Sequence, residues 1–289
     1  MYIFILALPS IYLLYLLYWQ YLIYILDALA HCCAFIKIRK NVFAYNLNLV
    51  LPEAKNHKDI EFKSLKLAYL NAFIALHQPY LMNRDSLSKR YIFEIPAALK
   101  SDIRSNKALL AIAHYGIFYD FSSIYQIFKL PVAPVYKMKN TYLEKWIYHG
   151  SVLKGKIFGI KHDKLHQHLN HPYGIIYLVC DQKGGQLPGT FLNRETKIHS
   201  SPADLHRISK RALWVYFCKY DFTRKKFIVS FVPVERYVTS RSKCEIAQQV
   251  ADIFSKEILS NPEQYFWIHD RFRNTVKKYK NGNKIKYLL

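Results

Sequence analysis

The stretch ALLAIAHYGIFYD (residues 108–120) combines the pattern of a buried strand with two groups that can take part in chemistry. Its first six residues are all apolar, and a short continuous apolar run is typical of a strand in a sheet that is covered on both faces. His114 follows this run directly, and the carboxylate of Asp120 comes six positions later. The stretch therefore predicts a central strand with a titratable side chain at its carboxyl end.

Five further segments downstream are also short and mainly apolar, and they are predicted to be strands of the same sheet. Mixed segments between the early ones are long enough for helical crossovers, which favours an α/β layered sheet with helices on both faces. Residues 37 to about 105 have mainly helical spacing, and CEIAQQVADIFSKEIL (244–259) predicts a last helix. The five predicted strands are PVAPVYK (131–137), KIFGIK (156–161), YGIIYLVCD (173–181), ALWVYFCK (212–219) and KFIVSFVPV (226–234).

The N-terminal segment is the most extreme part of the composition, because residues 2–26 contain no charged side chain. About 20 apolar residues suffice to span a bilayer, and no basic region or cleavage site marks a signal peptide. Its many Tyr and Trp residues are also typical of the membrane interface, so spanning and in-plane arrangements both stay open. The basic KIRK (37–40) favours a cytoplasmic flank. We expect a membrane-anchor helix within residues 1–36 and a domain of residues 37–289 on the cytoplasmic side.

The charge of the chain indicates a polyanionic partner. Lys and Arg number 42 against 20 Asp and Glu, a net charge of +22, which favours nucleic acid, anionic membrane, phosphorylated lipid or an acidic carrier protein. Nucleic acid is the weakest of these, because no recognised binding motif is present and it would not explain the apolar N-terminus. The five cysteines have no CxxC spacing and an odd number, which argues against a disulfide framework.

His114 is the best candidate for catalysis, because an imidazole near neutral pH can take a proton from a hydroxyl as that hydroxyl attacks. A nearby carboxylate would fix its tautomer and stabilise the imidazolium. Asp181 and Gln182 follow another predicted strand, and functional groups collect beyond the carboxyl ends of strands in such sheets. No Ser or Cys lies in a G-x-S-x-G turn, so direct transfer to a hydroxyl acceptor is the simpler chemistry.

The sequence predicts no metal and no cofactor. Gly184 and Gly185 belong to neither a dinucleotide fingerprint nor a P-loop. His162 and His166 have helical i, i+4 spacing, but a zinc site would need a third ligand and usually a glutamate beside the first histidine. A solvated helix face explains this pair better.

Four segments together resemble the bacterial lipid A secondary acyltransferases, the lauroyl and myristoyl transferase family. The most specific is NPEQYFWIHDRFR (261–273), which is similar to the closing P-E-Q-x-x-W-x-H-x-R motif of that family. The matches fall in one order between about residues 37 and 275. The other three are NLNLVLPE (46–53), AHYGIFYDF (113–121) and the segment 181–212, which begins DQ and contains FLNR in place of an F-x-G-R turn.

The resemblance implies transfer of a fatty acyl group from an acyl-carrier-protein thioester to a hydroxyl of a Kdo-bearing lipid A precursor, in lipopolysaccharide biosynthesis at the cytoplasmic face of a Gram-negative inner membrane. It implies His114 as the base, Asp120 as its carboxylate partner and a cationic site for the acceptor's phosphates. Both substrates are anionic, as the basic chain requires. The expected substrate-binding residues are Lys154, Lys156, Asp181, Gln182, Arg194, Arg271 and Arg273.

Two departures from the family pattern concern these residues. The family's acid lies five positions after its histidine, where this chain has Tyr119, and Asp120 comes one position later. One extra residue turns a helical side chain by about 100°, so Asp120 needs an irregular turn to reach the ring, and the Tyr119 hydroxyl is the alternative partner. The arginine that the family carries after its N-P-x-L-type segment is absent, and Lys154 and Lys156 are the nearest cations, without the bidentate fork of arginine.

Two other functions fit parts of the sequence. A lysophospholipid or other glycerolipid acyltransferase would use the same base chemistry. A catalytically silent, membrane-bound lipid-binding protein would explain the charge and the displaced acid.

Overall fold

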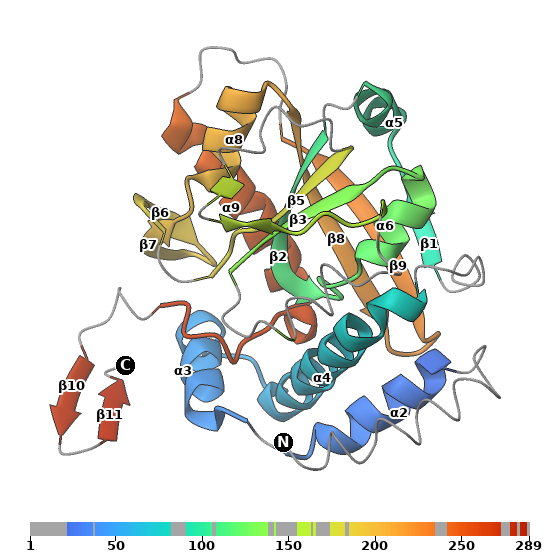
Figure 1. Cartoon of the computed structure of the whole chain (residues 1–289). Coiled ribbons are helices and arrows are strands. Elements are labelled where there is room, and N and C mark those ends of the chain that lie inside the picture. Colours follow the sequence, from blue (N-terminus) through green and yellow to red (C-terminus); the bar gives the residue numbers. More distant parts are fainter. Residues whose placement is uncertain are drawn as a thin grey trace.

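The computed structural model describes residues 22–36, 38–81, 91–105, 108–137, 142, 155–162, 164–165, 174–182, 185–234, 242–272, 278–281 and 284–287. Its elements are shown in Figure 1. The helices are α2 (Leu22–Cys33), α3 (Lys40–Val50), α4 (His57–Leu81), α5 (Ala97–Arg104), α6 (Phe121–Phe128), α8 (Ser201–Ser209), α9 (Lys243–Ser260) and the 3₁₀ helix η5 (Pro262–Gln264). The strands are β1 (Tyr91–Glu94), β2 (Ala108–Gly116), β3 (Val132–Tyr136), β4 (Ile160–Lys161), β5 (Ile175–Val179), β6 (Leu187–Phe191), β7 (Arg194–Ile198), β8 (Ala212–Asp221), β9 (Lys226–Pro233), β10 (Lys278–Asn281) and β11 (Lys284–Tyr287).

A seven-stranded sheet in the order β1-β9-β8-β2-β5-β3-β4 forms the centre of the molecule. β2 lies in the middle, parallel to both β8 and β5, and β8 pairs antiparallel with β9. Every residue of β2 is buried. A strand with neighbours on both edges and helices over both faces has no solvent side, which is why its sequence reads as one apolar run rather than an alternation.

Successive residues of β2 point into two separate hydrophobic cores. Ala108, Leu110 and Ile112 pack in the core that also receives side chains of α2, α4, α5 and α6. Leu109 and Ala111 pack in the other core, with side chains from α3, α8 and α9 and the first half of α4. The period of two along a strand produces this division. The predicted layered α/β sheet with helices on both faces is therefore present (Figure 1).

All six apolar runs predicted as strands contain a strand, although KIFGIK contributes only the two residues of β4. The predicted last helix is α9, which begins at a complete capping box of Ser242 and Glu245. Three features were not predicted. β1 lies inside the region expected to be mainly helical and pairs with β9. β6 and β7 form an antiparallel hairpin outside the main sheet, and β10 and β11 form another.

The predicted N-terminal membrane-spanning helix is wrong for the part of the chain that the structure describes. Of the expected anchor, residues 1–21 lie outside the described residues, and α2 covers only Leu22–Cys33. α2 packs along α4 (Figure 1), burying Leu26 and Ala30 in the protein core. Within the described residues, no helix combines the length and the apolar character needed to cross a membrane. The apolar face of α2 is covered by protein instead.

A buried ion pair holds α2 against the rest of the chain. The Asp27 carboxylate lies 2.7 Å from Lys66 Nζ of α4, and the Tyr220 hydroxyl of β8 donates to it at 2.7 Å. Burial acts to raise the pKa of Asp27, but the hydrogen bonds from Lys66 and Tyr220 outweigh it and leave the pKa below its ordinary value. Asp27 is therefore a folded-state carboxylate that is stabilised in its ionised form.

Lys66→Met should lower the free energy of unfolding by about 3 kcal/mol, because it leaves Asp27 buried without its closest cation. The contribution of Asp27 is present above its unfolded pKa of about 3.9 and is lost as the pH falls through the lowered folded value. Urea unfolding at pH 7 and at pH 3 measures both effects. The double variant Asp27→Asn/Lys66→Met is the control and should recover part of the loss. Equal stability of Lys66→Met and the parent chain at pH 7 would show that the pair contributes nothing.

Candidate active site

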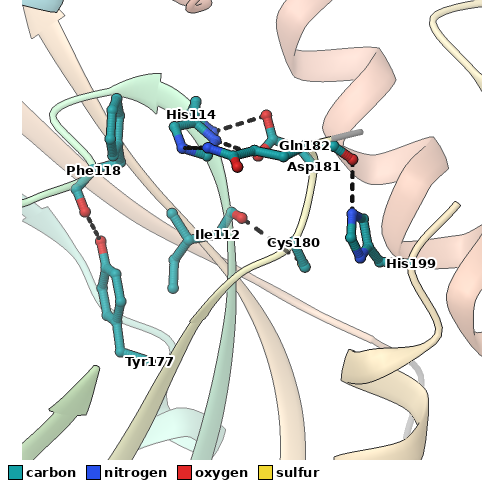
Figure 2. Close-up of polar contacts among 8 residues, drawn as sticks. All are labelled: Ile112, His114, Phe118, Tyr177, Cys180, Asp181, Gln182 and His199. Atoms are coloured by element: carbon teal, nitrogen blue, oxygen red, sulfur yellow. Dashed lines mark hydrogen bonds and ion pairs between the residues drawn. The ribbon is translucent and has the colours of Figure 1, made fainter. Parts of the chain in front are cut away.

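His114 and Asp181 form a hydrogen-bonded pair at the carboxyl ends of two adjacent strands. Ile112 of β2 is in register with Val179 of β5, so residues two positions further on face each other across the sheet edge. The Asp181 Oδ1 atom lies 2.6 Å from His114 Nδ1, and Asp181 Oδ2 accepts the His114 backbone N–H at 3.0 Å (Figure 2). Both side chains are buried. The strand order thus brings together two residues that are 67 positions apart.

The negative charge of Asp181 determines which ring nitrogen of His114 carries the proton. Burial alone would raise the pKa of Asp181, but the charge of His114 and its side-chain and backbone hydrogen bonds lower the pKa to about 2. An ionised carboxylate can only accept hydrogen bonds, so His114 Nδ1 carries the proton and Nε2 is the basic nitrogen of the neutral ring. This is the arrangement in which an imidazole acts as a general base while a carboxylate stabilises the cation that forms.

The basic nitrogen of His114 contacts Gln182, the next residue after the carboxylate. The two Nε2 atoms, one of each residue, are 2.6 Å apart, so the amide of Gln182 donates to the ring (Figure 2). The Gln182 backbone carbonyl in turn accepts from His199 Nε2 at 2.7 Å. On the opposite side, the Phe118 ring packs edge-on against His114 with centroids 4.6 Å apart. Packing and hydrogen bonds therefore fix the imidazole on several sides.

The predicted pairing of His114 with Asp120 is corrected by the structure. Asp120 is the N-cap of α6, and its Oδ1 accepts the Ser122 hydroxyl at 2.6 Å and the Ser123 backbone N–H at 3.2 Å. A capping carboxylate points back over the first helical turn, and both ring nitrogens of His114 are engaged by residues 181 and 182. Tyr119, the alternative partner, lines the cavity beside His114, and burial raises the pKa of its hydroxyl.

The loop after β2 turns sharply at Gly116. Its φ of +56° is left-handed, and a Cβ atom there would overlap the backbone carbonyl of Cys218 on β8. Asn71 of α4 holds the next residues: its side-chain amide donates to the Gly116 carbonyl at 2.6 Å, and its oxygen accepts the Phe118 N–H at 2.9 Å. The sequence analysis required an irregular turn to bring Asp120 to His114, whereas this turn brings Phe118 there.

A cavity of about 440 Å³ opens beside His114. Apolar and aromatic side chains line it together with lysine, histidine and glutamine side chains. A cavity that combines apolar walls with polar groups beside a titratable residue has the usual features of a ligand site. The lining residues are His114, Tyr119, Phe121, Pro134, Val135, Tyr136, Lys137, His162, Tyr177, Leu178, Val179, Gln182, Gln186 and His199.

Residues 261–272 close the other side of the histidine. The Phe266 N–H donates to the His114 carbonyl at 2.9 Å, and the His269 ring centroid lies 5.8 Å from that of His114. Asn46 of α3 fixes this segment by donating to the carbonyls of Trp267 and His269 at 2.7 and 2.6 Å. Burial, followed by the charge of His114, lowers the pKa of His269 to about 4, so His269 is neutral at physiological pH. Three segments far apart in the chain therefore meet at the His114 imidazole, and Asn46 of a fourth segment holds one of them in place.

Comparison with known families agrees with this convergence. The model of the bacterial lipid A biosynthesis acyltransferases matches residues 1–274, nearly the whole chain. The chain belongs to this family. It is accordingly an acyltransferase enzyme of lipid A biosynthesis. No curated protein sequence matches it significantly.

The three predicted cationic residues of the acyltransferase that the structure describes, Lys156, Arg194 and Arg271, do not line this cavity. Arg271 is 4 % exposed, donates to the Lys197 carbonyl at 2.9 Å and lies 4.7 Å above the Phe191 ring. Arg194 donates to the Leu49 carbonyl, and Lys156 Nζ lies 5.5 Å from the centre of the Tyr125 ring. Lys154 and Arg273 lie outside the described residues. Arg194 and Arg271 thus tie the β6–β7 hairpin to its neighbours.

Of the predicted substrate-binding residues, Gln182 lines the cavity of the acyltransferase. Asp181 accepts a hydrogen bond from His114 Nδ1. Sequence reasoning missed Lys137 and His199, which also line the cavity. Lys137 directly follows β3, so the rule that functional groups collect beyond strand ends could have identified it; nothing local distinguishes His199. His162 lines the cavity too, and among the described residues no group of His, Cys, Asp or Glu side chains is suited to a metal ion.

Proposed function

We propose that this acyltransferase moves a fatty acyl group from an acyl-carrier-protein thioester to a hydroxyl of a Kdo-bearing lipid A precursor, with His114 as the general base. The observation that carries the proposal is the His114–Asp181 pair at the wall of the cavity. The acceptor hydroxyl attacks the thioester carbonyl while His114 Nε2 takes its proton. The new C–O bond forms, the C–S bond breaks, and the imidazolium returns the proton to the departing sulfur.

The cavity supports the two substrates in different ways. Phe121, Tyr177 and Leu178 offer apolar surface to an acyl chain. Binding of the chain is stabilised in proportion to the apolar area that is removed from water. Lys137 and His162 offer positive charge or hydrogen bonds to phosphate groups of the acceptor or the carrier. The net charge of +22 favours both anionic partners.

The enzyme is further proposed to work at the cytoplasmic face of the inner membrane. Support comes from the turn between α2 and α3, where Phe35 and Ile36 are 70 % and 59 % exposed beside Arg39 and Lys40. Exposed apolar side chains next to basic ones suit the surface of an anionic bilayer. Sedimentation with anionic vesicles tests this proposal, and binding that persists unchanged in neutral vesicles and high salt would contradict its electrostatic part.

The reaction is tested with the purified protein, acyl-carrier-protein thioesters and a Kdo-bearing lipid A precursor, followed by mass spectrometry of the lipid. We expect a mass increase of one acyl chain, absent with His114→Ala. Parallel reactions with a lysophospholipid acceptor and with an acyl-coenzyme A donor separate the alternatives. Exclusive acylation of the lysophospholipid would replace the proposed acceptor, and no transfer to any lipid would refute the proposed reaction. Lipid A from cells with and without the gene provides the corresponding test in vivo.

A further inference from the structure

The amide of Gln182 occupies the position that an attacking hydroxyl must take. A general base has to lie within hydrogen-bond distance of the proton that it removes, about 2.6–3.2 Å between heavy atoms. The Gln182 Nε2 atom already lies 2.6 Å from His114 Nε2, on the one ring nitrogen that Asp181 leaves free (Figure 2). One lone pair cannot serve both groups, so the amide has to leave before an acceptor binds.

The contacts of Gln182 allow that movement. Its backbone is fixed, because the carbonyl accepts from His199 Nε2 at 2.7 Å. Within the described part of the chain, its side chain hydrogen-bonds to His114 alone, and the residue is exposed and lines the cavity. A rotation about the side-chain bonds therefore breaks one hydrogen bond and no apolar packing with the core. The amide group stays within a side-chain length of the reacting atoms after it has moved.

We propose that Gln182 caps the base in the resting enzyme and, once the acceptor hydroxyl displaces it, donates its amide N–H to the oxygen of the thioester carbonyl. That oxygen becomes negatively charged as the hydroxyl adds to the carbonyl carbon, and a positioned neutral donor stabilises this charge. This inference rests on the proposed acyl transfer by His114. The amide itself gains and loses no proton: the hydroxyl proton still passes to His114 and then to the sulfur of the leaving thiol.

Asp181 and Gln182 then act on opposite charges of the same transition state. Asp181 stabilises the positive charge that develops on the imidazole, from the Nδ1 side. Gln182 stabilises the negative charge that develops on the substrate, from the Nε2 side. Adjacent residues after β5 reach both ring nitrogens of His114, with the Asp181 carboxylate at Nδ1 and the Gln182 amide at Nε2 (Figure 2).

Gln182→Ala should lower kcat by on the order of 10²–10³, the usual effect of removing one oxyanion donor, with little change in KM. Gln182→Glu keeps the size of the side chain but presents a negative charge, and it should lower kcat by at least the same factor. Hydrolysis of the acyl-carrier-protein thioester in the absence of a lipid should fall in parallel, because water attack develops the same oxyanion. Gln248→Ala removes a glutamine amide that bonds to Thr190 and Asp252 away from the cavity, and serves as the control.

The capping of His114 by Gln182 is measured separately from activity. Diethyl pyrocarbonate modifies the imidazole, and peptide mass spectrometry gives the rate of modification at His114. Loss of a hydrogen bond to the reactive nitrogen should speed modification of Gln182→Ala by about tenfold, while its thermal midpoint stays that of the parent. Unchanged modification would refute the cap, and kcat within threefold of the parent, or above it, would refute oxyanion donation. If the parent enzyme acylates no lipid, the proposed function fails, whereas the modification and hydrolysis rates still decide the role of Gln182.

Discussion

Asp181→Asn is expected to lower kcat by on the order of 10³–10⁴ while the fold remains intact. The carboxylate accepts two hydrogen bonds from His114, one from Nδ1 and one from the backbone N–H. An amide of the same shape can no longer compensate the imidazolium, and it can present an N–H to Nδ1, which favours the wrong tautomer. Steady-state kinetics of acyl transfer, with circular dichroism to verify folding, measure the effect.

The matched control for this variant is Asp120→Asn, which alters the acid that the local sequence pattern favoured. Its remaining side-chain oxygen can still accept from Ser122 and Ser123, so we expect activity within a few-fold of the parent and a stability loss of about 1 kcal/mol from the weaker cap. The opposite result, a silent Asp181→Asn and an inactive Asp120→Asn, would mean that the functional enzyme uses a different pairing from the one seen in the structure.

His114→Ala is expected to lower kcat by on the order of 10²–10⁴, the usual contribution of a positioned general base. The substitution removes the ring that the side chains of Asp181 and Gln182 both contact. The space it leaves adjoins the cavity, so added imidazole should restore part of the rate. Acyl-transfer rates measured at increasing imidazole concentrations test this rescue.

A remote histidine provides the control for this second variant. His206 of α8 bonds through Nδ1 to the Arg211 carbonyl at 2.6 Å and does not line the cavity. His206→Ala should therefore keep the parent kcat and should not respond to imidazole. Near-normal rates for a correctly folded His114→Ala would show that the base is another group and would remove the basis of the proposed mechanism.

The strands and their two-sided burial could be predicted from the sequence because each signal is local. An apolar run such as 108–113 has no polar side chain to place in water, so it is buried wherever the sheet forms. β1 could not be predicted in this way. Its four residues Tyr91–Glu94 are only partly buried and gain their structure by pairing with β9, more than a hundred positions away. A short edge strand is stabilised by its neighbour rather than by its own pattern.

The part of the N-terminal segment that forms α2 was misread because hydropathy measures only the avoidance of water. An apolar helix is removed from water equally well in a bilayer or against another protein surface. For α2 the difference lies in Asp27, whose partners Lys66 and Tyr220 come from α4 and β8. Those partners are 39 and 193 positions away, and no window along the chain contains them.

The sequence by itself determined that His114 ends a buried strand, that Asp181 and Gln182 end another, and that the chain is an acyltransferase of the lipid A family. Only the tertiary structure decided which acid serves the base. Asp120 is near in sequence, but its carboxylate is used in capping α6. Asp181 is distant, but hydrogen bonding between β2 and β5 places it directly beside the imidazole. Side-chain proximity at a sheet edge depends on strand order and register, and these are set by packing over the whole sheet rather than by spacing along the chain.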